Sequence, residues 1–287
     1  MHEKKFPAEI MLEATNCCNN KCFFCGSLVS KRKRGYMDEK LMLRLISEAY
    51  ENGARKISFH GMGEPCLCKN LANYIGTAKR KGYTYIYLDT NGALATPEVI
   101  FPVIDAGLDS LKFSIHAATR ETYKRITDND VFQQVKDNFI KVSKYIKEKN
   151  NSCKLIGYFA ESTINCNELD AFKDMFEPYA DELWITPIHN ASGTKPENSR
   201  FSINKNVVAM KKLPCTDLNR MIINWEGDAI ACCTDWTGSL IYGDANVCSL
   251  KDLWNCQKIL QIREEQENIK SLNEICKKCM GCDKDMV

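Results

Sequence analysis

The sequence predicts an α/β protein in which a parallel sheet flanked by helices is followed by a small cysteine-rich module. From residue 8 to about residue 188, short apolar runs alternate with amphipathic runs at a spacing of roughly thirty residues, which is typical of repeated βα units. After Asn190 the alternation stops, and a polar segment rich in turn residues follows. The chain has 16 cysteines, which cluster toward its two ends. These observations predict one large βα domain and a smaller module that binds metal.

Six strands and five intervening helices are expected on this rhythm. Asp38 precedes the first helix as a cap, and glycines follow three of the helix ends. Six βα units are fewer than the eight that close a full barrel. The expected strands are Glu9–Thr15, Lys56–His60, Tyr83–Asp89, Ser110–His116, Lys154–Ala160 and Glu182–Pro187. The expected helices are Glu39–Asn52, Leu71–Lys81, Pro97–Ala106, Val131–Lys149 and Glu168–Pro178.

The chain divides into a βα region over residues 1–190, a bridge over residues 191–214 and a cysteine-rich module over residues 215–287. In the module, the segment MIINWEGDAIACC predicts a β-hairpin that turns at Glu226-Gly227-Asp228. A helix is expected near Leu250–Glu267. The module therefore combines a hairpin, a helix and a cysteine-rich tail.

Composition narrows the possible functions. The 287 residues are 44% hydrophobic and 26% charged, enough for a large core. A net charge of +2 gives no general attraction to nucleic acid or anionic lipid. The sequence contains neither a membrane-length apolar run nor the apolar core of a signal peptide, so a cytoplasmic location without a membrane partner is expected. In that compartment many cysteines indicate metal or cluster binding instead of disulfides.

Three cysteines follow the first strand in a C-x3-C-x2-C spacing: Cys18, Cys22 and Cys25. Neighbouring asparagines indicate a loop, in which three thiolates can face one point. Structural zinc usually takes four ligands, whereas a [4Fe–4S] cluster held by three cysteines keeps one iron open. Phe23 and Phe24 within the motif would shield such a cluster from water. The spacing favours the cluster, with a zinc knuckle or chance crowding as the alternatives.

This motif resembles the signature of the radical S-adenosylmethionine (SAM) superfamily. The resemblance implies an open, partial (β/α)6 TIM-like barrel with SAM bound at the open iron. His60-Gly61-Met62-Gly63-Glu64-Pro65 is similar to the family's G-G-E-P loop, with Met62 in place of a glycine. Further similar motifs end the third and fourth strands. The implied cofactor-binding residues are Phe24, Gly61, Met62, Gly63, Glu64, Pro65, Thr90, Asn91, Ser114 and His116. Judged alone, the loop is a tight turn, and His116 suits a buried core position equally well.

The C-terminal module resembles the SPASM or twitch extension of that family. Cys215, Gly227 and Cys232 have the spacing of its first half, while the tail ends soon after Cys282, which favours the shorter twitch version. The layout is similar to that of 2-deoxy-scyllo-inosamine dehydrogenase-like twitch enzymes. The resemblance implies one auxiliary [4Fe–4S] cluster, and a zinc ribbon is the alternative. Its ligands would be Cys215, Cys232 and two of Cys276, Cys279 and Cys282, of which Cys276 and Cys279 are the better pair.

The resemblance implies that a reduced cluster cleaves SAM to a 5′-deoxyadenosyl radical, which takes a hydrogen atom from a substrate. An auxiliary cluster with four thiolates favours dehydrogenation of a small polar substrate such as a sugar, aminocyclitol or amino-acid derivative. Glu161, Asn165 and His189 would bind this substrate at the barrel mouth. An epimerase would instead need a hydrogen donor, for which Cys248 and Cys233 are candidates. A peptide or protein maturase and a non-enzymatic iron–sulfur redox sensor or electron carrier are further alternatives.

The basic run Lys31-Arg32-Lys33-Arg34 lies beside the predicted cluster loop. It is suited to a phosphate or to an acidic electron donor such as flavodoxin or ferredoxin. A solvated loop explains the same charges. A role in RNA modification is disfavoured by the balanced net charge.

Overall fold

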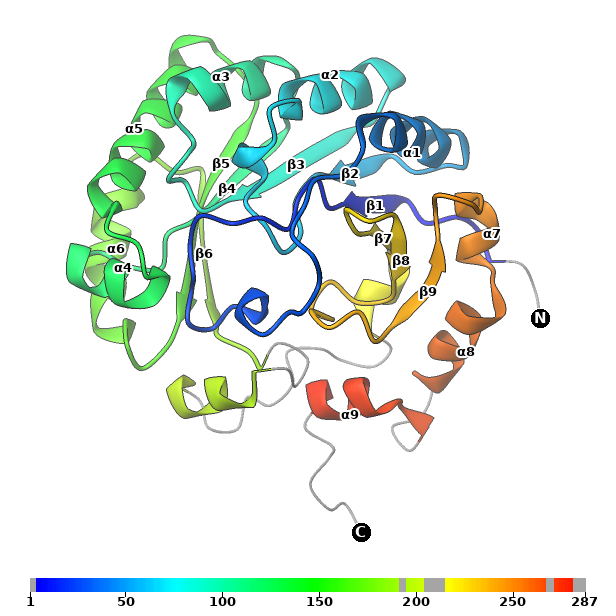
Figure 1. Cartoon of the computed structure of the whole chain (residues 1–287). Helices are drawn as coiled ribbons and strands as arrows, with labels where there is room; N and C mark the ends of the chain where they lie inside the picture. Colours follow the sequence, from blue (N-terminus) through cyan, green and yellow to red (C-terminus); the bar gives the residue numbers. More distant parts are fainter. Residues whose placement is uncertain (1–3, 191–194, 204–214, 267–270, 281–287) are drawn as a thin grey trace.

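We analysed a computed structural model that describes residues 4–190, 195–203, 215–266 and 271–280. Six parallel strands lie side by side in the order β6-β5-β4-β3-β2-β1. Figure 1 shows them curving into an open barrel with the helices on its outer face. The predicted partial barrel is therefore confirmed. The strands are β1 Glu9–Leu12, β2 Lys56–Ser58, β3 Tyr85–Thr90, β4 Ser110–Ser114, β5 Lys154–Glu161 and β6 Glu182–Pro187.

All five predicted helices are present, with ends within two residues of the prediction. A sixth helix in this region, α4, was not predicted, because its segment RETYKRIT is short and mostly polar. Its N-cap Thr119 accepts a hydrogen bond from Thr122 N–H, and Tyr123 and Ile126 are buried. The helices are α1 Glu39–Glu51, α2 Leu71–Lys81, α3 Pro97–Asp105, α4 Arg120–Thr127, α5 Phe132–Glu148 and α6 Leu169–Phe176.

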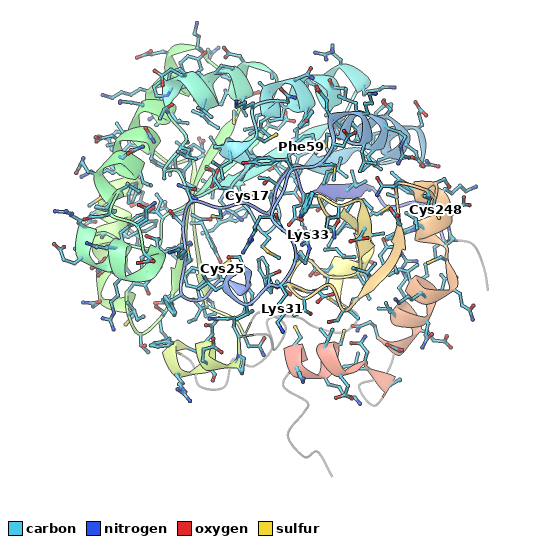
Figure 2. All side chains as sticks on the ribbon, in the orientation of Figure 1. Cys17, Cys25, Lys31, Lys33, Phe59 and Cys248 are labelled. Atoms are coloured by element: carbon cyan, nitrogen blue, oxygen red, sulfur yellow. The ribbon has the colours of Figure 1, made fainter. Side chains whose placement is uncertain are left out.

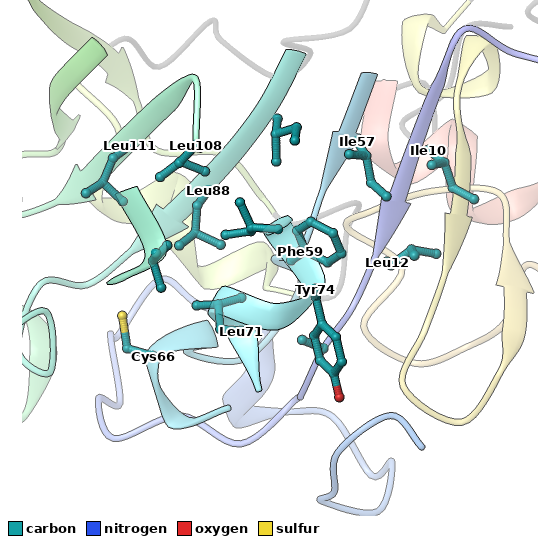
Figure 3. Close-up of a cluster of buried hydrophobic side chains, with 14 of the residues drawn as sticks. Ile10, Leu12, Ile57, Phe59, Cys66, Leu71, Tyr74, Leu88, Leu108 and Leu111 are labelled. Atoms are coloured by element: carbon teal, nitrogen blue, oxygen red, sulfur yellow. The ribbon is translucent and has the colours of Figure 1, made fainter. Parts of the chain in front are cut away.

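The main core lies between the sheet and this outer layer of helices. Along β3 the buried residues Ile86, Leu88 and Thr90 alternate with the half-buried Tyr85, Tyr87 and Asp89. The first set faces the helices, and Figure 3 shows its Leu88 in one apolar cluster with residues of α2 and its approach loop. The second set lines the inside of the barrel. The sheet therefore has an apolar outer face and a polar inner face, which leaves room for chemistry inside.

The C-terminal segment continues the barrel sheet. β7 Met221–Ile223 pairs in parallel with β1, and β8 Asp228–Ile230 and β9 Ile241–Asp244 follow in antiparallel order, giving nine strands among the described residues. The hairpin and its turn were predicted, and Gly227 has the positive φ of +95° that the turn requires. The pairing with β1 and strand β9 were not predicted. The division into three domains remains a prediction.

The predicted helix near Leu250–Glu267 is two helices, α7 Leu250–Trp254 and α8 Gln257–Glu265. The break occurs at Asn255 and Cys256, and Cys256 has the extended backbone of a cap residue. A last helix, α9 Glu274–Met280, carries two of the predicted ligands. No helix of the described residues is both long and apolar enough to cross a membrane.

Candidate functional site

The three-cysteine loop lies across the carboxyl ends of the barrel strands. Figure 2 shows Cys17 and Cys25 of this loop over the barrel mouth. The Lys21 and Phe23 amides donate to the backbone oxygens of Thr127 and Ile126, at 2.8 and 2.9 Å. The Sγ of Cys25 accepts a weak hydrogen bond from the Ser27 amide at 3.4 Å. The end of α4, which the sequence did not predict, thus fixes the middle of the motif.

The three thiols suit a bound cluster. Protein atoms packed around the sulfur of Cys18 are the main reason that the pKa of this thiol is raised to about 11. The negative charges of Glu64 and Cys25 also raise it. Burial, followed by the charges of Cys25 and Cys18, raises the pKa of Cys22 well above its ordinary value. Three thiolates in this space need a cationic partner. No group of three or more His, Cys, Asp or Glu side chains in the described residues is arranged around a single metal ion. Three thiols on one loop match the ligand count of a [4Fe–4S] cluster with an open iron, whereas structural zinc usually takes four ligands.

The Gly61–Pro65 loop packs against the cluster loop. Glu64 N–H donates to Cys17 O at 2.7 Å, and a Cβ on Gly63 would overlap the backbone of Thr15, Asn16 and Cys17. Gly63 therefore lets the backbone of the cluster loop approach closely, and its predicted part in binding SAM stays a prediction. A Cβ on Gly61 would likewise approach the Glu13 side chain, at 2.7 Å from Cγ. Both glycines position the loop.

Glu64 joins this loop to the end of β3. Its buried carboxylate accepts hydrogen bonds from Thr90 Oγ1 at 2.7 Å, Asn91 N at 2.7 Å and Cys66 N at 3.0 Å. Burial raises the pKa of Glu64 despite these bonds. The Glu64 and Thr90 side chains bond to each other, and their predicted part in binding SAM stays a prediction. Pro65 begins a 3₁₀ turn, Pro65–Leu67, and the Glu64 side chain caps this turn.

Asn91 connects the third strand to the cluster motif. Its Nδ2 donates to Asn19 Oδ1 at 2.8 Å and lies 3.8 Å from Cys18 Sγ. Ser114 ends β4 and is half-buried on the inner face of the sheet. Contact of these two residues with the cofactor stays a prediction.

His116 occupies a buried structural position. Its Nδ1 accepts the Ala160 amide at 2.9 Å, its φ is +65°, and the Phe24 ring packs edge-on against it at a centroid distance of 5.2 Å. Burial, followed by the charge of Lys112, lowers its pKa to about 3, so the imidazole is neutral. The structure supports the core-histidine alternative, in which His116 seats Phe24 of the cluster loop.

Glu13 was missed by sequence analysis, although it connects three parts of the site. Its carboxylate accepts Arg32 Nη2 at 2.7 Å, Met62 N at 2.9 Å and Trp225 N at 3.2 Å. The two charged side chains are only 9% and 6% exposed. A carboxylate at the last position of an otherwise apolar strand was the available signal.

The basic run divides into two sets. Arg34 donates to Asn16 O and Ser27 O at 2.6 and 2.7 Å, so Arg32 and Arg34 both bind inside the loop. Lys31 and Lys33 alternate with them and are exposed. The solvated-loop interpretation is therefore wrong for Arg32, whose side chain is 9% exposed, and fits the lysines, while Arg34 is exposed but bonded to the loop backbone.

A polar cavity of about 210 Å³ lies inside the barrel and extends toward the amino ends of the strands, because Glu9, Lys56 and Tyr85, which begin β1, β2 and β3, line it. Asp89 in its wall bonds to Lys112 Nζ at 2.8 Å, with His60 Nε2 at 3.7 Å. Although burial alone would raise it, these two groups and Arg220 hold the pKa of Asp89 below its ordinary value. Burial, only partly offset by Asp89, lowers the pKa of His60. Asp89 and Lys112 alternate with buried core residues along β3 and β4. Sequence analysis did not use this alternation to predict polar residues inside the barrel.

The three residues predicted to bind the substrate differ in position and burial. Glu161 ends β5 and is half-buried, and His189 is exposed beyond the end of β6. Asn165 is fully buried and holds two loops together, because its Nδ2 donates to His116 O and Ala160 O at 2.8 and 3.0 Å. Asn165 is therefore corrected from a substrate contact to a structural residue.

The two candidate hydrogen donors lie in different places. Cys248 is exposed on the turn before α7, and Figure 2 places it at the rim, away from the barrel mouth. Its predicted role is therefore wrong. Cys233 lines a small recess together with Glu13, Met62 and Trp236, and its Sγ donates to Asp217 Oδ2 at 3.5 Å.

A second recess brings together four of the predicted auxiliary ligands: Cys215, Cys232, Cys276 and Cys279. The recess is small, at about 30 Å³, and is partly open to solvent. Apart from Gln266, its other walls are apolar: Leu218, Ala231, Leu240, Ile262 and Ile275. Burial raises the pKa of Cys276 to about 11, with contributions from the three other thiols. Four converging thiols in an apolar recess fit a buried cluster. Cys282 lies outside the described residues.

Comparisons with known proteins match both regions. The family model of the radical SAM superfamily matches residues 12–165, and that of an iron–sulfur cluster-binding domain, SPASM, matches residues 215–280. A probable GTP 3′,8-cyclase of Saccharolobus islandicus is 32% identical over 128 residues, which are 44% of this chain and only 41% of that protein. The SAM-dependent 2-deoxy-scyllo-inosamine dehydrogenase of Niallia circulans is 22% identical over 94% of this chain and 91% of its own length.

Solved structures share the fold. BtrN in complex with AdoMet and 2-DOIA has a TM-score of 0.65 at 21% identity, covering 96% of this chain and 93% of its own. Streptococcus suis SuiB bound to the precursor peptide SuiA has a TM-score of 0.68 at 16% identity, covering 90% of this chain and 67% of its own. Both cofactors expected from the sequence, a SAM-binding [4Fe–4S] cluster and an auxiliary cluster, are supported by these matches.

Proposed function

The chain belongs to the radical SAM superfamily, and we propose that it dehydrogenates a small polar substrate inside the barrel. The observation that carries this proposal is the second recess, whose four thiols leave an auxiliary cluster no open iron. A cluster without an open site can exchange electrons but cannot bind the substrate. The dehydrogenase from Niallia circulans, similar over 94% of this chain, supports the same reaction class.

Cys18, Cys22 and Cys25 would hold the first cluster, and Cys215, Cys232, Cys276 and Cys279 the second. When bound, the first cluster with SAM supplies the radical that removes one hydrogen atom, and the second supplies an acceptor for the remaining electron. The substrate thus loses a hydrogen atom, an electron and a proton, which together equal two hydrogens. Phe24, seated on His116, would keep water from the first cluster.

The polar inner wall of the barrel would bind the substrate. Asp89 offers a carboxylate acceptor and Lys112 an ammonium donor on the wall of one cavity. The hydroxyls of Tyr158 and Thr186 bond to each other at 2.6 Å nearby on β5 and β6. Such groups suit hydroxyl and amino substituents, as in a sugar, an aminocyclitol or an amino-acid derivative. Glu161 and His189 remain candidates at the outer rim.

An epimerase with Cys233 as hydrogen donor is a second candidate function. Cys233 lies in the same recess as Met62 of the loop that contacts the first cluster motif. A maturase acting on peptides has only shared folds in its favour, such as those of SuiB bound to SuiA, at 16% identity, and of anSMEcpe bound to the Kp18Cys peptide, at 13% identity. A non-enzymatic redox role does not explain the polar cavity inside the barrel.

Mass spectrometry in deuterated buffer tests the proposal. Candidate substrates are incubated with the reduced enzyme and SAM, and consumption of SAM is measured. A dehydrogenase gives a product two mass units lighter, with one SAM consumed per turnover. An isomer that carries solvent deuterium, with no oxidised product, would instead establish the epimerase. In that case Cys233→Ala should block isomer formation while SAM cleavage continues.

An acidic one-electron donor, flavodoxin or ferredoxin, would supply the first electron. The exposed Lys31 and Lys33 lie on the cluster loop a few residues from Cys25, with Leu28 and Val29 exposed beside them at 46% and 39%. Positive charge around a small apolar patch suits an acidic protein surface. Since such donors act in the reducing cytosol, the prediction of a cytoplasmic location accompanies this proposal.

A further inference from the structure

Gln266 has an unusual environment for an amide side chain. It follows α8 directly, is only 2% exposed, and lines the recess that contains the four auxiliary thiols. Its Nε2 is buried and has no hydrogen-bond partner among the residues that the structure describes. Buried amide nitrogens in proteins almost always have an acceptor. The structure therefore leaves one strong donor in the recess without a bond.

The orientation of this amide is fixed by its other end. Gln266 Oε1 accepts the backbone N–H of Cys215, at 3.4 Å between nitrogen and oxygen. A backbone N–H can bond only to the oxygen of the amide, so the nitrogen must take the opposite position. The side chain thus binds the residue that carries one predicted ligand and presents its N–H groups elsewhere.

The remaining walls of the recess offer little for this donor. They consist of the four cysteines and of apolar side chains such as Leu240 and Ile262. Sulfur is therefore the acceptor chemistry that the recess provides. Hydrogen bonds to cluster sulfurs stabilise the reduced, more negative state and so raise the reduction potential.

We propose that Gln266 Nε2 donates a hydrogen bond to a sulfur of the auxiliary cluster and thereby raises the potential of that cluster. The inference rests on the proposed four-cysteine ligation. A higher potential makes the cluster a better electron acceptor, which is the property that dehydrogenation requires. The proposal about Gln266 does not depend on which substrate is oxidised.

The test measures a potential instead of turnover. The full-length protein with both clusters is titrated and followed by electron paramagnetic resonance, in which added SAM changes only the signal of the first cluster. Gln266→Met keeps the side-chain length but removes the donor. Gln266→Glu keeps the acceptor for Cys215 and also removes the donor. In both variants, the equilibrium constant for reducing the auxiliary cluster should fall about tenfold or more. For a one-electron couple, a tenfold fall lowers the reduction potential by about 59 mV.

Gln261 on the same helix provides matched controls. It is exposed, and its Nε2 donates to Glu265 at 3.1 Å. Gln261→Met and Gln261→Glu should leave both potentials unchanged. An unchanged or raised auxiliary potential in the Gln266 variants would overturn the proposal. Loss of the auxiliary cluster in Gln266→Met but not in Gln266→Glu would also overturn it, because Gln266 would then act only by holding Cys215. Failure of the dehydrogenase assay leaves this potential measurement unaffected.

Discussion

The two thiol sites are built in opposite ways. The first takes its three cysteines from eight consecutive residues, and backbone hydrogen bonds to α4 and to the Gly61–Pro65 loop shape that loop. The second collects four cysteines from segments far apart in the chain, in the apolar recess beside β8 and α9. In the first site, the short spacing along the chain already brings the three cysteines together. In the second site, the four cysteines meet only after the chain has folded. The two sites should therefore fail independently when their own supports are removed.

Gly63→Val should have the largest effect, on the first site alone. A side chain there would overlap the backbone of Thr15–Cys17, so the cluster loop cannot keep its position. Iron should fall from about eight to about four atoms per chain, and SAM binding should be lost. Iron analysis and calorimetry measure both. Gly76→Ala is the control, because Gly76 has no positive φ and its new Cβ would meet first the flexible end of the Arg80 side chain, at 3.1 Å. A Gly63→Val protein with full iron and normal SAM affinity would contradict the packing described here.

Replacing Cys276 and Cys279 by serine should remove only the second cluster. Both residues lie on α9 and line the recess, so their loss leaves two of its four thiols. Iron should again fall to about four atoms per chain, whereas SAM cleavage without substrate should continue. Quantifying 5′-deoxyadenosine separates the two sites. Cys256→Ser, whose thiol bonds to Tyr242 O instead, should keep all the iron.

Arg32→Met should destabilise both regions together, by about 3–5 kcal/mol, because it leaves the Glu13 carboxylate buried without its cation. Urea unfolding of the protein measures this change. Adding Glu13→Gln should recover a large part of it. Lys31→Met, at the exposed neighbouring position, should change stability by less than about 0.5 kcal/mol. Equal effects of the two single variants would show that the Glu13 network does not connect the regions.

Acid should weaken the first site before the second through Glu168. Although burial alone would raise it, bonds from Thr119, Thr122 and Ala118 hold the pKa of Glu168 below its ordinary value of 4.5. The unfolded chain therefore takes up the proton first. This contribution is present above pH 4.5 and is lost as the pH falls through the lower folded value. Glu168→Gln should flatten the pH dependence of unfolding measured by urea between pH 7 and pH 3, and Glu148→Gln should not.

The smallest effect concerns electron delivery. Lys31→Glu with Lys33→Glu should slow reduction of the first cluster by an acidic protein donor about tenfold at low salt, and added salt should reduce the difference. Reduction by dithionite should be unchanged. Stopped-flow absorbance follows both reactions. The control is the charge reversal Lys4→Glu with Lys5→Glu, because these two lysines lie near Cys215 and not on the cluster loop. A slower dithionite reaction would mean that the lysines shape the site itself.

The βα rhythm predicted the six barrel strands because each strand carries its own apolar signal. β7 was predicted as half of a hairpin, but its place next to β1 was not, since three residues contain no information about a distant partner. The motifs also placed Gly63 beside the cluster loop, although they could not tell a ligand from the chain's own backbone. Glu13 and Asp89 were missed because their roles depend on contacts between strands. The candidate site could thus be located from sequence, but not the bonds that hold it.

The parallel pairing of Ile10 with Met221 has a consequence for synthesis of the chain. At roughly 5–20 residues per second, the ribosome needs about 10–40 s to make the residues between them. During that interval one edge of β1 has no neighbour, and an open strand edge invites pairing with other nascent chains. The last part of the chain therefore covers the first strand. A chain that stops before β7 is expected to aggregate, even though all six βα units have been made.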